Sequence, residues 1–350
     1  MSLDSSVRSV RRSIRSVSVA AAPPTHDELV TKMTGGMTRS DLPRFEGSER
    51  LRTDGRPKPA FRAELRRIPN FINAIEVVAT MAAPVTVIAA VMAIGYPLAV
   101  VAAIPVIGTL QLRWFILHHE AAHRLLFSNR WLNDRIGINL LGWLPMGTGS
   151  HFYRRGHAIH HRDEFGPKEP DFLLYSFYPI SGKSLRRKLV RDIVGVSAWR
   201  ITKPRFTGLV KLKYVPLSLR FFAGQAIVFG LFWLAGHPWL YLLLWALPWF
   251  TWYQFINRLR AIAEHGGMTR TADRRNTTHH IRQSWLARVL FVPYHVGYHL
   301  AHHVDSGIPA RNLPRLQRAL SEDGYLPADA SWPTYRALWR GLSSAEPRAA

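Results

Sequence analysis

The segment VVATMAAPVTVIAAVMAIGYPLAVVAAIPVIGTLQL, residues 77–112, contains no Asp, Glu, Lys or Arg. One membrane crossing needs about 20 apolar residues, so this run is long enough for two crossings. Gly95-Tyr96-Pro97 stands near its middle, and glycine and proline favour a turn there. A second uncharged run, residues 221–257, has Gly236-His237-Pro238 near its middle. The two runs predict two helical hairpins, with transmembrane helices at about residues 72–94, 98–120, 219–236 and 239–262.

The distribution of charge predicts how these hairpins are oriented. The protein has 46 Lys and Arg against 23 Asp and Glu, a formal net charge of +23. The two turns carry no Lys or Arg, so the positive-inside tendency places the N-terminal, middle and C-terminal segments in the cytosol. Anionic lipid head groups account for this charge without a nucleic-acid partner. We therefore expect an integral protein of a bacterial inner membrane with both termini in the cytosol.

Composition also predicts the limits of the membrane domain. Residues 1–60 are rich in Ser and Arg, and we expect a basic, disordered tail there. Residues 61–330 are expected to form the membrane domain, and residues 331–350 a C-terminal tail. Residues 183–199, KSLRRKLVRDIVGVSAW, place apolar side chains at helical spacing opposite basic ones, which predicts a helix that lies on the membrane.

Histidine is the residue that carries the chemistry. The chain has no cysteine, which excludes thiolate zinc sites and Cys-ligated iron–sulfur clusters, but it has 16 His. Many of these lie in three short motifs: HHEAAH (118–123), HAIHH (157–161) and HLAHH (299–303). The spacing H-x-x-H-H places three imidazoles on one face of a helix. An even number of predicted crossings separates each pair of motifs, so all three are expected on the same side of the membrane, and His265 can join them.

The number of imidazoles predicts more than one metal ion. Zinc takes about four protein ligands, and these motifs supply eight or nine, so two ions are the simpler count. Nitrogen ligands suit Zn, Cu, Fe or Ni. Iron with open positions is the member of this group that activates dioxygen readily. An acyl chain offers only unactivated C–H bonds, which acid–base groups cannot attack, and dioxygen chemistry would explain such a site.

The motifs HEAAH, HAIHH and HLAHH resemble those of the membrane fatty acid desaturase family over roughly residues 70–325. The flanking sequences FYRRGHAIHHRDEFGPKEPD and VPYHVGYHLAHHVDSGIPARNLPRL are similar to a bacterial branch that includes the rhizobitoxine desaturase, so the substrate need not be a plain fatty acid. The resemblance implies an all-α integral membrane fold, with four transmembrane helices and a cytosolic helical cap that holds two irons. It implies as metal ligands His119, His123, His157, His160, His161, His265, His299, His302 and His303.

Some positions differ from the family pattern or extend it. Many members have Asp where this chain has Glu120, and some have Asn where it has Ala261. His118 is an alternative ligand in the first motif, because the longer spacing to the next His also occurs in the family. Glu120 is expected to orient a ligand imidazole from behind, since such carboxylates fix the ring and its tautomer. Asp171 and Glu169, in the segment KEPD, are expected to do the same.

The predicted activity is an oxygen-dependent di-iron desaturation that introduces a C=C bond into a fatty acyl or related lipid-like chain. No flavin, nicotinamide or haem motif is visible, so electrons are expected from a separate carrier, such as ferredoxin or cytochrome b5 with its reductase. The same site would also serve a hydroxylase or a ketolase. His119, Glu120 and His123 also form the HExxH signature of an intramembrane zinc protease, but residues 221–257 offer no Asp as the third ligand.

Overall fold

The structure is a computed structural model that describes residues 24–345. The helices of its first half are α1 (His26–Met33), α2 (Pro59–Leu65), α3 (Asn70–Ile94), α4 (Pro97–Ala122), α5 (Arg130–Leu132), α6 (Phe152–Arg162), α7 (Phe172–Tyr175) and α8 (Gly182–Ile193). Those of the second half are α9 (Val196–Thr207), α10 (Val215–Leu234), α11 (Gln254–His265), α12 (Trp285–Leu290), α13 (His299–Val304), α14 (Leu313–Glu322) and α15 (Tyr335–Leu342).

Other regular structure is short. The π-helical stretches are Asn133–Leu140, Leu242–Ala246 and Trp249–Tyr253. The 3₁₀ turns are Gly208–Val210, Leu212–Tyr214, Arg274–Asn276, Ala310–Asn312 and Ala328–Ala330. Two strands of two residues, β1 (His280–Ile281) and β2 (Ser331–Trp332), pair in parallel and tie the C-terminal segment to the chain that follows α11. The described part of the protein is therefore almost entirely helical, as expected.

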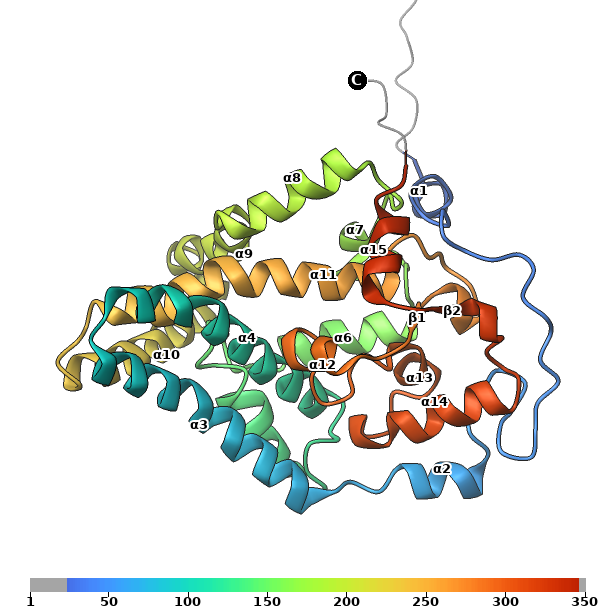
Figure 1. The fold of residues 1–350 in the computed structure, drawn as a ribbon, viewed down its shortest axis with the longest axis horizontal. Coiled ribbons are helices and arrows are strands. Elements are labelled where there is room, and N and C mark those ends of the chain that lie inside the picture. Colours follow the sequence, from blue (N-terminus) through green and yellow to red (C-terminus); the bar gives the residue numbers. More distant parts are fainter. Residues whose placement is uncertain (1–23, 346–350) are drawn as a thin grey trace, which may run out of the picture.

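Three helices within residues 24–345 are long and apolar enough to cross a membrane: α3, α4 and residues 212–234, which contain α10. By length and composition they correspond to the first three predicted spans, at residues 72–94, 98–120 and 219–236. The turn between α3 and α4 has the predicted chemistry, because Gly95 ends α3 in a left-handed conformation and Pro97 begins α4. In Figure 1 these helices and the segment that leads into α11 gather at one end of the molecule, opposite α1, α2 and α13–α15.

The fourth predicted span is helical but irregular. Residues 240–265 contain two π-helical stretches before α11, with Pro248 between them. The segment packs closely on α4: Gln111 Nε2 donates to the Trp245 carbonyl at 2.8 Å, and Trp252 Nε1 donates to Thr109 Oγ1 at 3.0 Å. Because of its π turns, this segment is not one uniform helix like α3 or α4.

The segment before α3 does not have the structure that its composition predicted. Leu51 and Leu65 are fully buried in a cluster with side chains of α13 and α14. Arg50 forms ion pairs with Glu322, at 3.0 Å, and with Asp323 at the end of α14. The expected loose tail is therefore wrong for residues 24–60, because scattered apolar side chains find a hydrophobic surface that is remote in sequence. Residues 1–23 lie outside the described part.

The C-terminal segment also differs from the prediction. Leu338 and Leu342 of α15 are fully buried, and Trp339 Nε1 donates to the Leu259 carbonyl of α11 at 3.0 Å. Helix α15 is strongly amphipathic, and its apolar face packs on the main hydrophobic core. The expectation of a tail is therefore wrong for residues 331–345, and residues 346–350 lie outside the described part.

Candidate metal centre

Nine imidazoles from four segments of the chain come together at the C-terminal end of α4. His119 is on the last turn of α4 and His123 ends that helix. α6 contributes three rings, α13 contributes three more, and α11 ends at His265. The structure brings together every ring that the family resemblance indicated: His119, His123, His157, His160, His161, His265, His299, His302 and His303.

The nine rings divide into two groups. The five-histidine group contains His119, His123, His157, His161 and His302. The four-histidine group contains His160, His265, His299 and His303. In each group one nitrogen of every ring lies within 4.8 Å of the others. Each H-x-x-H-H motif supplies both groups, because residues three and four apart on a helix lie on slightly different sides of one face.

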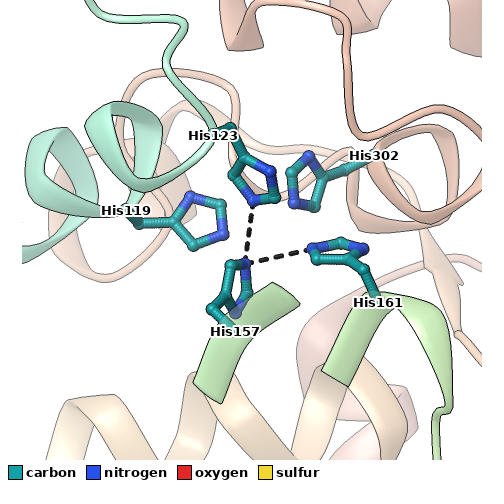
Figure 2. Close-up of side chains that lie close together, drawn as sticks. All are labelled: His119, His123, His157, His161 and His302. Atoms are coloured by element: carbon teal, nitrogen blue, oxygen red, sulfur yellow. Dashed lines mark hydrogen bonds between the residues drawn. The ribbon is translucent and has the colours of Figure 1, made fainter. Parts of the chain in front are cut away.

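The rings of the five-histidine group point toward a common centre (Figure 2). His157 Nε2 lies 2.8 Å from His123 Nε2 and 3.0 Å from His161 Nε2. The Nε2 atoms of His119 and His302 are buried and have no hydrogen-bond partner in the described structure. A buried nitrogen without a hydrogen-bond partner costs roughly 1–3 kcal/mol of folding free energy. This arrangement is therefore unfavourable unless another group, such as a metal ion, binds these nitrogens.

Three of the four rings in the four-histidine group have an Nδ1 that is held by a hydrogen bond. His160 Nδ1 donates to Glu169 Oε1 at 2.5 Å, and His265 Nδ1 donates to the Thr277 carbonyl at 2.8 Å. His303 Nδ1 donates to Glu164, which also forms an ion pair with Arg274 at 2.8 Å. A proton held on Nδ1 leaves the Nε2 lone pair free and facing the group, as in metal-binding histidines.

Electrostatics favours the neutral form of most of these rings. Burial, reinforced by neighbouring imidazoles, lowers the pKa of the rings of α6 and α13 named here: His157, His161, His299, His302 and His303. Burial also lowers the pKa of His160, but the hydrogen bond and charge of Glu169 outweigh it and the net pKa is raised. Neutral imidazole is the form that binds metal, so the groups are prepared to act as ligands at neutral pH.

The residues present fit a pair of metal ions. The inward nitrogens include buried atoms without partners, and carboxylates or a carbonyl fix the outward nitrogens of three rings of the four-histidine group, those of His160, His265 and His303. Two ligand nitrogens that each lie about 2.1 Å from one ion are at most about 4.2 Å from each other. The facing nitrogens within each group lie within 4.8 Å of one another, which is close to this value. One ion in each group would supply the missing partners.

Other residues singled out by sequence lie around this centre. His118 belongs to neither group, because its Nδ1 donates to the Gly137 carbonyl at 2.9 Å. Glu120 Oε1 accepts a hydrogen bond from the Ala310 N–H at 2.9 Å, so this oxygen is engaged away from the rings. Asp171 forms no hydrogen bond to an imidazole in residues 24–345, although its charge contributes to the raised pKa of His160.

Sequence reasoning expected Glu169 beside an imidazole and missed two other carboxylates. Glu164 follows the HAIHH motif by three residues, and Glu264 immediately precedes His265. Glu264 Oε1 lies 3.5 Å from His299 Nδ1. Proximity to a motif was the available signal, but spacing alone does not show which way a carboxylate points.

Two cavities reach the imidazoles. A narrow one, beside α3 and α4, is lined by His119 and His302. Another, of about 430 Å³, is lined by His161, His303 and several arginines. These arginines are Arg52, Arg56, Arg62 and Arg274. The two cavities give the centre an approach beside the apolar helices and a separate, strongly basic one.

The fold combines long apolar helices with two adjacent groups of imidazoles. These features indicate a membrane protein with a metal site. The sequence model named "Fatty acid desaturase" matches residues 95–336, which include all nine rings, and the chain belongs to this family of oxidoreductases. It is 27% identical to "Dihydrorhizobitoxine desaturase" of Bradyrhizobium elkanii over 252 residues, 65% of this chain and 69% of that protein. It is 24% identical to "sn-1 oleoyl-lipid 12-desaturase" of Arthrospira platensis over 253 residues, 64% of this chain and 70% of that protein.

Proposed function

We propose that the protein is an oxygen-dependent di-iron desaturase that introduces a C=C bond into a fatty acyl or related lipid-like chain. The observation that carries this proposal is the division of nine imidazoles, seven of them buried and two half-buried, into two adjacent groups. A site for one zinc ion would use only about four of them. The names of the two relatives, an oleoyl-lipid desaturase and a dihydrorhizobitoxine desaturase, support a lipid-bound acyl chain or a different small compound as the substrate.

The proposed ligands are the five-histidine group for one iron and the four-histidine group for the other. When bound, the irons would supply the reaction of O2 with two substrate hydrogens, two electrons and two protons, which leaves an alkene and two waters. The chain itself fixes the geometry: Glu164 and Glu169 hold Nδ1 protons, so the Nε2 atoms of His303 and His160 stay free. Burial of seven of the nine rings limits the access of water to the centre.

The electrons are proposed to come from a separate carrier, a ferredoxin or a cytochrome b5 with its reductase. The arginine-lined cavity beside His161 and His303 supports this part of the proposal, because positive charge attracts an acidic carrier and speeds its encounter. His161 belongs to the five-histidine group and His303 to the four-histidine group, and their rings stack with centroids 4.2 Å apart. This pair would place both groups near the same basic opening.

The proposed location is a bacterial inner membrane, with four crossings and with both termini and the imidazoles in the cytosol. The irregular helix of residues 240–265 would be the fourth crossing. The turns at residues 95–96 and 235–239 carry no Lys or Arg, whereas the segments that surround the imidazoles are basic, which agrees with the positive-inside tendency.

A comparison of total lipids and small metabolites tests this function. Cells that produce the protein are compared with cells that produce the His157→Ala variant, with both proteins present in the membrane at equal amount. We expect a compound two hydrogens poorer only with the unchanged protein. A product with one added oxygen would instead indicate the hydroxylase, and identical lipid and metabolite profiles would contradict the proposal.

A further inference from the structure

An apolar cavity opens beside the membrane helices. It has a volume of about 500 Å³ and lies between α3, α4, Trp252 and the end of α12. Its lining includes Ala83, Val106, Leu110 and Val289. Val106 and Val289 are each 45% exposed, so the cavity is open to the apolar surroundings of these helices.

This cavity follows the same helix faces as the narrow cavity beside the imidazoles. On α3, Ala83 and Thr80 line the apolar cavity, and Glu76 lines the narrow one. Such steps of three and four residues stay on one side of a helix. On α4, Arg113 lines the apolar cavity, and Ile116 and Leu117, three and four residues further along, line the narrow one. The two cavities are therefore neighbours along α3 and α4 and share Tyr294 in their linings.

Tyr294 stands at the junction of the two cavities and lines both. Its hydroxyl is hydrogen-bonded to the hydroxyl of Thr80. Tyr294 and His295 have φ angles of 55° and 64°, a left-handed conformation that is uncommon for residues other than glycine. Because Tyr294 lines both cavities, an apolar chain that passes from one to the other has to pass beside this side chain.

Arg113 brings a positive charge into this apolar cavity. Its guanidinium donates to the Val289 carbonyl at 3.1 Å and lies 5.6 Å from the centre of the Tyr294 ring. No carboxylate within residues 24–345 forms an ion pair with it, and Glu76, which lines the neighbouring cavity, is already paired with Arg311. Glu76 still interacts with Arg113 electrostatically, but not as a direct ion pair. A charged residue at membrane level that has no ion-pair partner is a candidate binding site for an anion.

We propose that this cavity admits an amphiphile from the membrane and that Arg113 binds its anionic head, a carboxylate or a phosphate. The chain of the amphiphile extends past Tyr294 toward His119 and His302. Arg113 and His119 are six residues apart on α4, roughly 9 Å along the helix axis. The head therefore fixes which carbons stand beside the imidazoles. The claim that the head sets which carbons react is the second part of this inference, and it rests on the proposed desaturation. The first part, that the cavity binds an anionic amphiphile, does not.

Binding can be tested without turnover through the reactivity of one introduced thiol, because the chain has no cysteine of its own. Ala83→Cys places a thiol in the cavity lining, and a thiol reagent then reports whether the cavity is filled in detergent micelles. We expect a long-chain carboxylic acid to protect this thiol. Adding Arg113→Gln should weaken the protection about ten-fold or more, since a hydrogen bond to a charged group contributes about 1.5–3 kcal/mol. Arg113→Lys should restore part of it.

Controls separate the charge from other effects. Arg220, on α10, also lies over a tryptophan, at 5.4 Å from Trp143, but lies outside the cavity, so Arg220→Gln should leave protection unchanged. The alcohol with the same chain has no charge for Arg113 to bind, so its protection should be equal with and without Arg113→Gln. An intact anionic phospholipid tested beside the free acid identifies the source of the head group. If neither anion depends on Arg113, the proposal is overturned.

The position of the new double bond tests the second part. With acids of several chain lengths, we expect the bond at a constant number of carbons from the carboxyl group. A bond at a constant distance from the methyl end would overturn the fixed head. Arg113-dependent protection without oxidation of any acid would support the binding site and contradict the proposed desaturation, so the two failures are distinguishable.

Discussion

At the scale of single residues, the two imidazole groups are held differently. In the four-histidine group, Glu164, Glu169 and the Thr277 carbonyl accept Nδ1 protons. No carboxylate in residues 24–345 is hydrogen-bonded to a ring of the five-histidine group. A carboxylate behind an imidazole fixes its tautomer and makes it a stronger ligand. We therefore expect the ion in the four-histidine group to be the more tightly held.

Glu164→Gln tests this expectation. Removal of a residue that orients a ligand usually costs about 10–100-fold in metal affinity, so the variant should lose its metal to a chelator sooner than the unchanged protein. Metal content after dialysis against a series of chelator concentrations measures the change. Glu120→Gln is the matched control, because its carboxylate accepts from the Ala310 N–H and an amide oxygen can do the same. Equal metal retention in the two variants would argue against the orienting role.

The three histidine motifs stand out in the sequence because of their helical spacing, and the resemblance to the desaturase family implied the set of candidate ligands. Their division into two groups could not be predicted, since it depends on how α6 and α13 face each other. His118 and His119 are adjacent, and only the turn of α4 decides that His119 faces the centre while His118 faces Gly137. The orienting carboxylates were harder still, because Glu164 and Glu264 resemble ordinary surface residues in the sequence.

At the scale of helices, composition predicts where an apolar segment lies but not its irregularities. Three of the four expected spans correspond to α3, α4 and α10 by length and composition. The π turns at Leu242–Ala246 and Trp249–Tyr253 leave the composition unchanged and were not predicted. The amphipathic segment 183–199 was expected to be one helix, but Gly195 adopts φ 81° and divides it into α8 and α9.

Gly137 shows how the packing of two helices positions ligands. It lies in the π-helical stretch Asn133–Leu140, and a Cβ there would stand 2.1 Å from the Cβ of Ala121 on α4. Ala121 lies between the ligands His119 and His123. Gly137→Ala should push α4 away, lower the free energy of unfolding by roughly 1–3 kcal/mol and reduce the metal bound by the five-histidine group.

Thermal unfolding in detergent and metal analysis check this outcome. The matched control is Gly230→Ala on α10, where a Cβ would meet nothing within 4 Å. Alanine is the better helix former, so the control should be neutral or more stable by about 0.5–1 kcal/mol. A Gly137→Ala protein with unchanged stability and metal content would show that this contact does not position α4.

At the scale of the whole molecule, the two terminal segments help enclose the imidazoles. Arg52, Arg56 and Arg62 line the basic cavity, and α15 packs on α11, which ends at His265. Composition alone suggested loose tails, because the partners of these segments lie far away along the chain. Asp305, for example, pairs with Arg62 at the mouth of that cavity. Long-range pairings of this kind are not visible in local sequence patterns.

The stability of the folded protein should fall as the solution is acidified. Burial lowers the pKa of His279 and of His280 to about 4, whereas an unfolded histidine titrates near 6.5. Between these values the unfolded chain binds more protons, so stability decreases as pH falls from about 6.5 toward 4, by up to about 3 kcal/mol for each ring. The melting temperature between about pH 7.5 and 5 measures this, and His279→Gln should flatten the curve. A constant or rising melting temperature on acidification would contradict it.

The central claim is that the two imidazole groups bind separate irons, and metal analysis tests it most directly. Iron per chain is measured in the unchanged protein, in His157→Ala and in His265→Ala, after anaerobic loading and removal of loosely bound metal. We predict two irons in the unchanged protein and about one in each variant, with X-ray absorption showing nitrogen ligands. A single zinc per chain, or two irons retained in both variants, would contradict the claim.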